Sequence, residues 1–469
     1  MLKEVVRLSL NVKYQYTHFI YPFVVERSEY TNFLSSILSQ EKDWSLYIHN
    51  YETDKESYDF FLPYMKRFLF PTLFWNLDYE KQFKAMSLSK KVYNISKLSC
   101  ITFDYQLSSI KTGSVELGRR FGEINFDISS IRLIVFKGGI CFLDIKTEIE
   151  EPREYIDFNK LLDFNNSFRK LTPRGIGSLS KLTKMKARNI DKIENIAIFI
   201  KSIISGFETK DIEKMYYDKM FTYSYACVDD WKKENDFDTM KNDFLKFQYV
   251  MSSKSSAIFN KNCTTLYENM YSRWQYSMFG FSKESGVVLV SEREKYNITK
   301  MPYNFEKKYL YMLLLALYQR ITLMNFSQDL AKKDKSMARS LTNRFTKFTH
   351  FSWFSEITNS ENGMEIWENW VKAFKLKELF DEVHKEYIEY YDFVKSTGQE
   401  RFNLVIMLTY VVNIAFSGIS LFANLFNFRE HWLAPVILAL MVTAMSSYPI
   451  FLISRWIKHK IENKMDNDI

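Results

Sequence analysis

Cysteine is scarce in this chain of 469 residues. The four cysteines, Cys100, Cys141, Cys227 and Cys263, lie far apart and form no CxxC pair. This spacing excludes a disulfide framework and a cysteine-based zinc site, and it fits a reducing cytosol. The N-terminal stretch also lacks the apolar core of a signal peptide, because charged residues interrupt it.

Motifs that read nucleic acids are missing, and so is a basic tail. The net charge of +8 is modest for this length, and the basic residues stand in mixed-sign patches such as 331–335. We therefore expect no nucleic-acid partner. The six histidines are scattered, and none belongs to a metal-ligand or triad-like motif. The sequence consequently predicts no enzyme activity and no covalent cofactor.

The first part of the chain combines strand and helix patterns. Two apolar runs, Ile131–Phe136 and Ile140–Lys146, flank Gly138 and Gly139, and glycine supplies the positive φ that tight hairpin turns require. This pattern predicts a β-hairpin. Apolar spacing predicts helices over Ile156–Leu171 and Ile193–Phe207, and a strand or two before Phe23. We therefore predict an α/β cytosolic domain over residues 1–303.

Long helical patterns follow, and they predict a stalk over residues 304–400. The run Tyr309–Tyr318 is strongly apolar but too short to cross a bilayer, which favours a buried helix. From Met364, apolar residues recur at three- and four-residue steps almost into the next apolar segment. If this helix continues to about Leu425, it is roughly 90 Å long at 1.5 Å per residue.

Two apolar segments close the chain, Arg401–Phe428 and Trp432–Ile453. Each is long enough for a membrane span, which takes about 20 apolar residues. We expect spans at about 402–426 and 432–453, in a transmembrane domain of residues 401–469 with a short basic tail. Lys and Arg flank the pair on its inner side, which predicts a multi-pass protein of a bacterial inner membrane with both termini in the cytoplasm.

Uncharged polar residues form a line on the first of these segments. At about 100° per residue they fall within an arc of roughly 80°; they are Thr409, Asn413, Ser417, Ser420 and Asn424. Two interpretations stay open. The line can join neighbouring helices through hydrogen bonds, or it can line a pore when several copies assemble.

This layout resembles the CorA-type divalent-cation transporters. That family carries Gly-Met-Asn at the outer end of its first span; here Phe422 and Ala423 replace Gly and Met, and Asn424 is kept. The resemblance implies an α/β cytosolic domain, a stalk helix, two C-terminal transmembrane helices and a homopentamer. It also implies a pore mouth at Phe422, Ala423 and Glu430, with Mg²⁺ or a similar divalent cation as the transported or regulatory ion.

Three functions remain open from the sequence. The first is an oligomeric CorA-like channel or transporter for divalent cations, gated through the stalk. The second is a CorA-like membrane effector of a bacterial antiphage system, type III CRISPR-associated, gated by a small signalling nucleotide. The third is a non-conducting binding protein anchored in the lipid bilayer.

Overall fold

The computed structural model describes residues 10–107, 112–117, 122–151, 154–171, 184–187, 194–204, 219–229, 236–255, 259, 268–332 and 338–425. Within them the chain separates into two compact units. The first contains Met1–Ser327 and Phe345–Val383, and the second contains Gln328–Arg344 and His384–Ile469. Each unit is described on its own below.

A sheet of 13 described strands organises the first unit. Its longest path runs β11-β12-β13-β10-β1-β6-β5-β4-β8-β9, with β2 and β3 branching from β5 and β7 pairing with β1. Most neighbours are antiparallel, whereas β10 and β13 are parallel. The strands are β1 (Asn11–Val24), β2 (Trp44–Leu46), β3 (Cys100–Tyr105), β4 (Thr112–Leu117), β5 (Gly122–Phe136), β6 (Ile140–Ile149), β7 (Ile156–Asp157), β8 (Lys184–Ala187), β9 (Glu194–Asn195), β10 (Phe221–Val228), β11 (Met270–Tyr271), β12 (Ser277–Phe281) and β13 (Ser285–Ser291).

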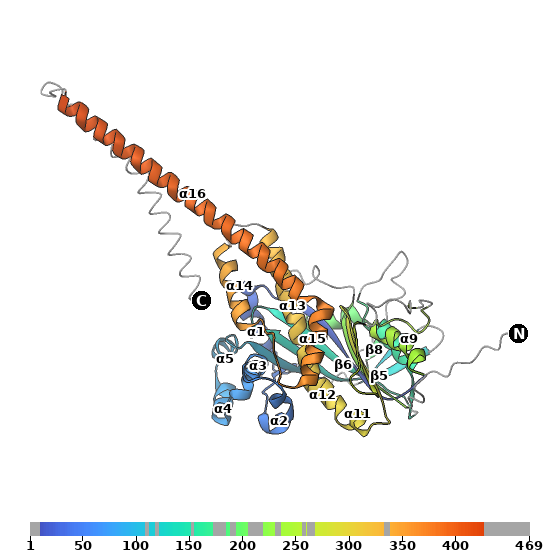
Figure 1. Cartoon of the computed structure of the whole chain (residues 1–469). Coiled ribbons are helices and arrows are strands. Elements are labelled where there is room, and N and C mark those ends of the chain that lie inside the picture. The colour runs from blue at the N-terminus through green and yellow to red at the C-terminus, as the bar shows by residue number, and fades with distance from the viewer. Residues whose placement is uncertain are drawn as a thin grey trace. The chain divides into compact units, whose positions relative to one another are not determined.

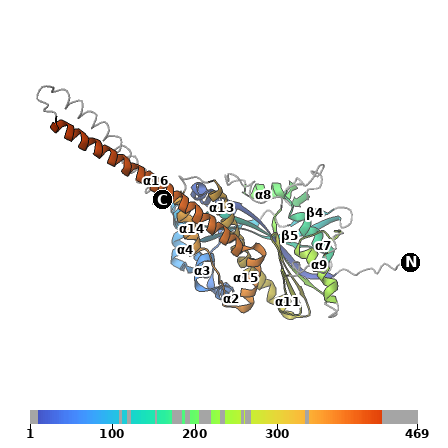
Figure 2. The same ribbon diagram turned by 45° about the horizontal axis from the view of Figure 1, so that its top comes forward.

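Helices occupy both faces of this sheet (Figure 1 and Figure 2). Before β10 they are η1 (Arg27–Glu29), α1 (Tyr30–Ser39), α2 (Tyr51–Phe60), α3 (Pro63–Leu69), η2 (Pro71–Phe74), α4 (Leu77–Ala85), α5 (Leu88–Ile95), α7 (Phe158–Phe168) and α8 (Ile196–Ile204). The helices that follow β10 in the chain are α9 (Asp236–Gln248), α11 (Lys295–Thr299), α12 (Met301–Asn304), η6 (Phe305–Tyr309), α13 (Leu310–Ala331), α14 (Ala338–Phe351), α15 (Glu361–Phe374) and α16 (Leu376–Leu425), and parts of α13, α14 and α16 belong to the second unit.

Glycines show which helices cover which face. Gly280 and Gly286 lie on opposite faces, since Gly280 pairs with Val287 and successive strand residues alternate. A side chain on Gly280 would meet Gln248 of α9, and one on Gly286 would meet Trp370 of α15. The helices α9 and α15 therefore cover opposite faces. Both glycines allow a helix to approach the sheet closely.

The predicted hairpin and three of the predicted helices are confirmed. β5 and β6 pair from Phe136 opposite Ile140, with Gly138 and Gly139 at positive φ. A side chain on Gly139 would lie 2.1 Å from the Val25 carbonyl oxygen, so glycine is required there. α7 and α8 fall within the predicted helical ranges. The predicted buried helix is the start of α13, where Leu310–Tyr318 are all buried.

The predicted fold class, an α/β body followed by two C-terminal transmembrane helices, is corrected by the structure. The described chain is a mixed α/β protein with one large sheet, and none of its described helices is long and apolar enough to cross a membrane. In α16 the described side chains of 376–396 are rich in charge.

This finding also contradicts the transmembrane and ion-channel character and the multi-pass inner-membrane localisation predicted from the sequence. The second predicted span, 432–453, lies outside the described residues.

Candidate functional site

The turn η6 places three consecutive charged side chains, those of Glu306, Lys307 and Lys308, in two different environments. It is a turn of π-helix, which is wider than an α-helical turn and often occurs at functional sites. Phe305 anchors it to the sheet, because its ring stacks on that of Tyr223 with centroids 4.0 Å apart. Glu306 then faces the sheet, and Lys307 and Lys308 face α2.

Strand register brings a group of charged residues together beneath Glu306. Asp104 lies opposite Arg132, which lies opposite Asp144, and His18 lies opposite Lys146. Residues directly opposite in register share a face of the sheet. Alternation therefore aligns the five side chains on the face that η6 covers.

Short contacts connect this group, which we call the inner network. Lys146 Nζ donates to Glu306 Oε2 at 2.8 Å, and Arg132 Nε donates to Asp104 Oδ1 at 3.1 Å. An Arg132 guanidinium nitrogen lies 3.8 Å from Glu306 Oε1. His18 Nδ1 lies 3.0 Å from both carboxylate oxygens of Asp144. Three acidic groups thus alternate with three basic ones.

Electrostatics in the inner network favour an ionised Glu306. Burial alone would raise the pKa of this carboxyl group, but the nearby His18, Lys146 and Arg132 outweigh burial and lower the pKa to about 2. At His49, burial and the nearby charges act in the same direction. Burial is the largest cause, and with the positive charges of Arg132 and Lys307 it lowers the pKa of His49 to about 3. His49 is therefore neutral at physiological pH.

Within the inner network, the His18–Asp144 pair is shielded from substrates. His18 and Asp144 are each 0 % exposed. A general base must reach the proton that it abstracts, directly or through one water molecule. A His–Asp pair with no exposed surface cannot do so, and its geometry instead serves to join β1 to β6.

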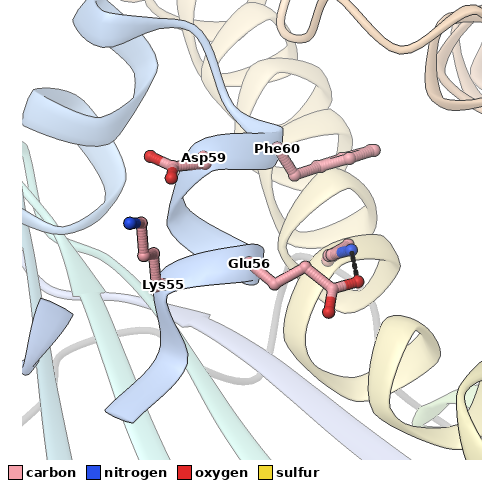
Figure 3. Close-up of a pocket in the computed structure, with 5 residues that line it drawn as sticks. Lys55, Glu56, Asp59 and Phe60 are labelled. Carbon is pink, nitrogen blue, oxygen red and sulfur yellow. Dashed lines mark hydrogen bonds and ion pairs between the residues drawn. The ribbon is translucent and has the colours of Figure 1, made fainter. Parts of the chain in front are cut away.

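A surface pocket lies on the outer side of the same turn. It has a volume of about 560 Å³ and is lined by Lys55, Glu56, Asp59, Phe60 and Lys308. In Figure 3 the side chains of Glu56 and Phe60 point toward the helix that carries Lys308, while Lys55 and Asp59 extend to the other side of α2. We call this the α2–η6 pocket.

Ion pairs hold the two sides of the α2–η6 pocket together. Lys308 Nζ donates to Glu56 Oε1 at 3.0 Å and lies 5.5 Å from the centre of the Phe60 ring. Lys307 Nζ donates to Asp54 Oδ2 at 3.1 Å. Asp54 has non-helical angles inside α2, with φ −131° and ψ 32°. This kink divides α2, and Asp54 pairs with Lys307 just before the pocket begins.

The residue pair Lys308–Glu56 is unequal in exposure. The Lys308 side chain is 9 % exposed, whereas that of Glu56 is 56 % exposed. Lys308 lowers the pKa of Glu56 by hydrogen bonding and by its charge. A nearly buried cation therefore depends on a carboxylate that water can readily solvate.

The predicted pore-lining residues Thr409, Asn413, Ser417, Ser420 and Asn424 lie together on α16, and Phe422 and Ala423 lie there too. Thr409 is exposed and its Oγ1 donates to the carbonyl oxygen of Val405 at 2.8 Å. Glu430 is outside the described residues. Nothing in this arrangement tests a pore-lining role, which stays a prediction.

The part of the chain that the structure describes contains no evident metal site. No group of three or more His, Cys, Asp or Glu side chains there could hold a metal ion. The divalent cation inferred from the sequence thus has no assigned ligands among those residues.

Sequence reasoning missed the α2–η6 pocket and the inner network. Lys307 and Lys308 stand out only as charges before an apolar helix, and Glu56 lies 252 residues before Lys308. No local pattern announces such a pairing. A charged triplet directly before a buried helix is the one available signal, since charges so close to a core need partners.

Comparisons with protein-family models, with curated proteins and with solved structures found no match. The resemblance to the CorA-type transporters therefore stays a prediction.

Proposed function

We propose that the α/β unit is a binding module for a small organic anion with a flat ring, which occupies the α2–η6 pocket. The observation that carries this proposal is the unequal pair of Lys308 and Glu56. A buried ammonium group needs an anionic partner. Its present partner is mostly solvated and can return to water at little cost, so a ligand anion can replace it.

The rest of the pocket supports a ring-bearing ligand. Phe60 offers an aromatic surface beside Lys308, because the centre of its ring lies 5.5 Å from Lys308 Nζ. Ligand pockets combine apolar surface with a few polar groups that fix orientation. An anionic group on Lys308 and a ring on Phe60 would satisfy both parts at once.

The position of η6 gives binding a consequence. Two charged residues precede Lys308 in η6. Lys307 pairs with Asp54, and Glu306 pairs with Lys146. A change of partner at Lys308 therefore acts on a turn whose other charges are fixed in the sheet and in α2. This favours a sensing role for the module over catalysis, because the His18–Asp144 pair is enclosed.

Calorimetric titration of the full chain with phenyl phosphate tests the proposal. Inorganic phosphate, which has the anionic group but no ring, and phenol, which has the ring but no anionic group, serve as comparison probes. We expect phenyl phosphate to bind more tightly than either. Lys308→Met should abolish binding, and Lys295→Met, an exposed lysine of α11, should leave it unchanged.

Glu56→Gln gives the sharper result. Removing the internal competitor should strengthen phenyl phosphate binding by up to about fivefold, because an exposed ion pair contributes up to about 1 kcal/mol. Absence of binding to every probe, or equal affinity in the wild type and Glu56→Gln, would overturn the proposal.

A further inference from the structure

The helices α3, α4 and α5 and the turn η2 together present a basic surface with exposed aromatic rings. Residues 63–97 contain seven Lys and Arg but only two Asp and Glu. Most of the chain's formal net charge of +8 therefore comes from these 35 residues. In Figure 1 these helices lie together in blue. We call the surface formed by Arg67, Phe74, Lys81, Lys84, Tyr93 and Lys97 the basic–aromatic face; all six residues are exposed.

Packing within these helices directs the two rings outward. On α5, Val92 and Ile95 are buried, so Tyr93 between them projects from the opposite side. On α4 and the preceding loop, Trp75 contacts Tyr79 and Phe83 with ring centroids 4.9 Å and 5.0 Å apart. These contacts use the inner side of the layer. Tyr93 remains 62 % exposed and Phe74 56 % exposed.

Each exposed ring has its own cation. Lys97 Nζ lies 3.6 Å from the centre of the Tyr93 ring, and the Arg67 guanidinium carbon lies 5.8 Å from the centre of the Phe74 ring. A cation over one face of a ring leaves the other face open to a flat partner. Large exposed aromatic side chains are unfavourable in water, so a face that keeps two of them is typical of an interaction site.

The geometry points to single-stranded nucleic acid as the occupant, and we propose that the basic–aromatic face binds it. Single-strand binding surfaces combine cations that follow the phosphates with aromatic rings on which bases stack. Arg67, Lys81, Lys84 and Lys97 supply the cations, and Phe74 and Tyr93 supply the rings. An acidic peptide would neutralise the same cations but would leave both rings uncovered.

This proposal departs from the expectation that the chain has no nucleic-acid partner. That expectation rested on the absence of a recognition motif and of a basic tail. Sequence-independent binding requires neither, because backbone charge and stacking provide the affinity. Four successive elements of the folded chain, α3, η2, α4 and α5 with the turn that follows it, carry these exposed cations and rings.

Fluorescence anisotropy of the full chain with a labelled thymidine strand of about 20 nucleotides tests the proposal; this length exceeds a typical single-strand site. The double variant Phe74→Ala/Tyr93→Ala should bind at least about thirtyfold more weakly, because each lost stacking contact reduces affinity by at least about fivefold. Phe351→Ala, which removes another exposed ring, should bind as the wild type does. Unchanged melting temperatures show that the variants are folded.

Salt dependence separates stacking from charge. Affinity should fall with rising salt, and Lys81→Gln/Lys84→Gln should reduce the slope of log affinity against log salt by about 1.4, which corresponds to two phosphate contacts on a single strand. Lys295→Gln is the matched control.

Three results overturn the proposal. They are no binding at roughly 50 mM salt, where such contacts are strong, undiminished binding by the ring variant, and equally tight binding of a polyglutamate peptide. The last result would assign the face to an acidic protein partner.

Discussion

Glu306 is the residue at which the sheet and the surface pocket meet. Its side chain is 20 % exposed, and its carboxylate lies between Lys146 and Arg132, whose side chains are both largely buried. Breaking a buried ion pair by removing one partner is costly, because the remaining charge keeps its desolvation without compensation. The sequence gives no sign of this role, since Glu306 is one acidic residue beside two lysines. Its partners come from β5 and β6, more than a hundred positions away.

The folded state should therefore lose stability in acid through Glu306. Its pKa falls from 4.5 to about 2 on folding, so its contribution is complete above about pH 5 and disappears as the pH falls toward 2. The contribution is about 3 kcal/mol, at about 1.4 kcal/mol per unit of pKa. Urea denaturation between pH 7 and 2 should show this loss in the wild type.

Glu306→Gln should be less stable than the wild type at pH 7 and should change less between pH 5 and 2. Glu80→Gln on α4 is the control and should keep the wild-type pH profile. If Glu306→Gln follows the wild-type profile over that range, the ionised carboxylate does not stabilise the fold.

At the scale of the element, the structure differs from the prediction made from apolar spacing at a helix boundary. The hairpin of β5 and β6 and the helices α7, α8 and α13 follow from local apolar spacing and from glycine in the turn. The single helix predicted from Met364 to about Leu425 is wrong in one place: α15 ends at Phe374, and α16 begins at Leu376. Lys375 between them is left-handed, with φ 53° and ψ 46°. Apolar residues recur on both sides of this break, and lysine is not a usual left-handed residue, so the pattern conceals it.

Lys375→Gly should stabilise the chain. Glycine adopts the left-handed conformation without the steric cost that lysine has there. We expect a gain of about 0.5–1 kcal/mol after allowance for the greater entropy of glycine in the unfolded chain. Urea denaturation with an unchanged m-value measures the gain.

Lys375→Val is the opposing variant. A β-branched residue is strained at positive φ, so this change should destabilise the fold by about 1 kcal/mol or more. A stabilising Lys375→Val would mean that the helix runs through this position without a break.

At the scale of the whole molecule, the order of elements along the chain does not show which elements lie side by side in the fold. The sheet places β10 between β13 and β1, and β1 between β10 and β6. The α2–η6 pocket likewise joins Glu56 to Lys308. Sequence patterns indicated β1 and the hairpin of β5 and β6, but neither β10 and β13 nor the pairing of β1 with β6, because pairing depends on partners far apart in the chain. The sequence boundary at 303 has the same weakness, since it rests on a change of local pattern.

Truncation distinguishes two divisions of the chain. The segment Phe345–Val383 belongs to the same compact unit as the sheet. Trp367 and Trp370 of α15 are each 1 % exposed, and Trp370 packs against Phe281 with ring centroids 4.9 Å apart. A chain ending at Val383 should therefore unfold cooperatively, within a few degrees of the full chain. A chain ending at Tyr303 loses α13 and α15, uncovers one face of the sheet and should show no cooperative transition.

Calorimetry and near-ultraviolet circular dichroism on both truncated chains measure this difference. A cooperative transition in the chain that ends at Tyr303 would show that the sheet is stable without α13 and α15. The boundary predicted from sequence would then be the physical one. If the chain that ends at Tyr303 shows no cooperative transition and the longer chain shows a normal one, α13 and α15 are part of the core. The reason is that the apolar face that they cover cannot remain exposed to water.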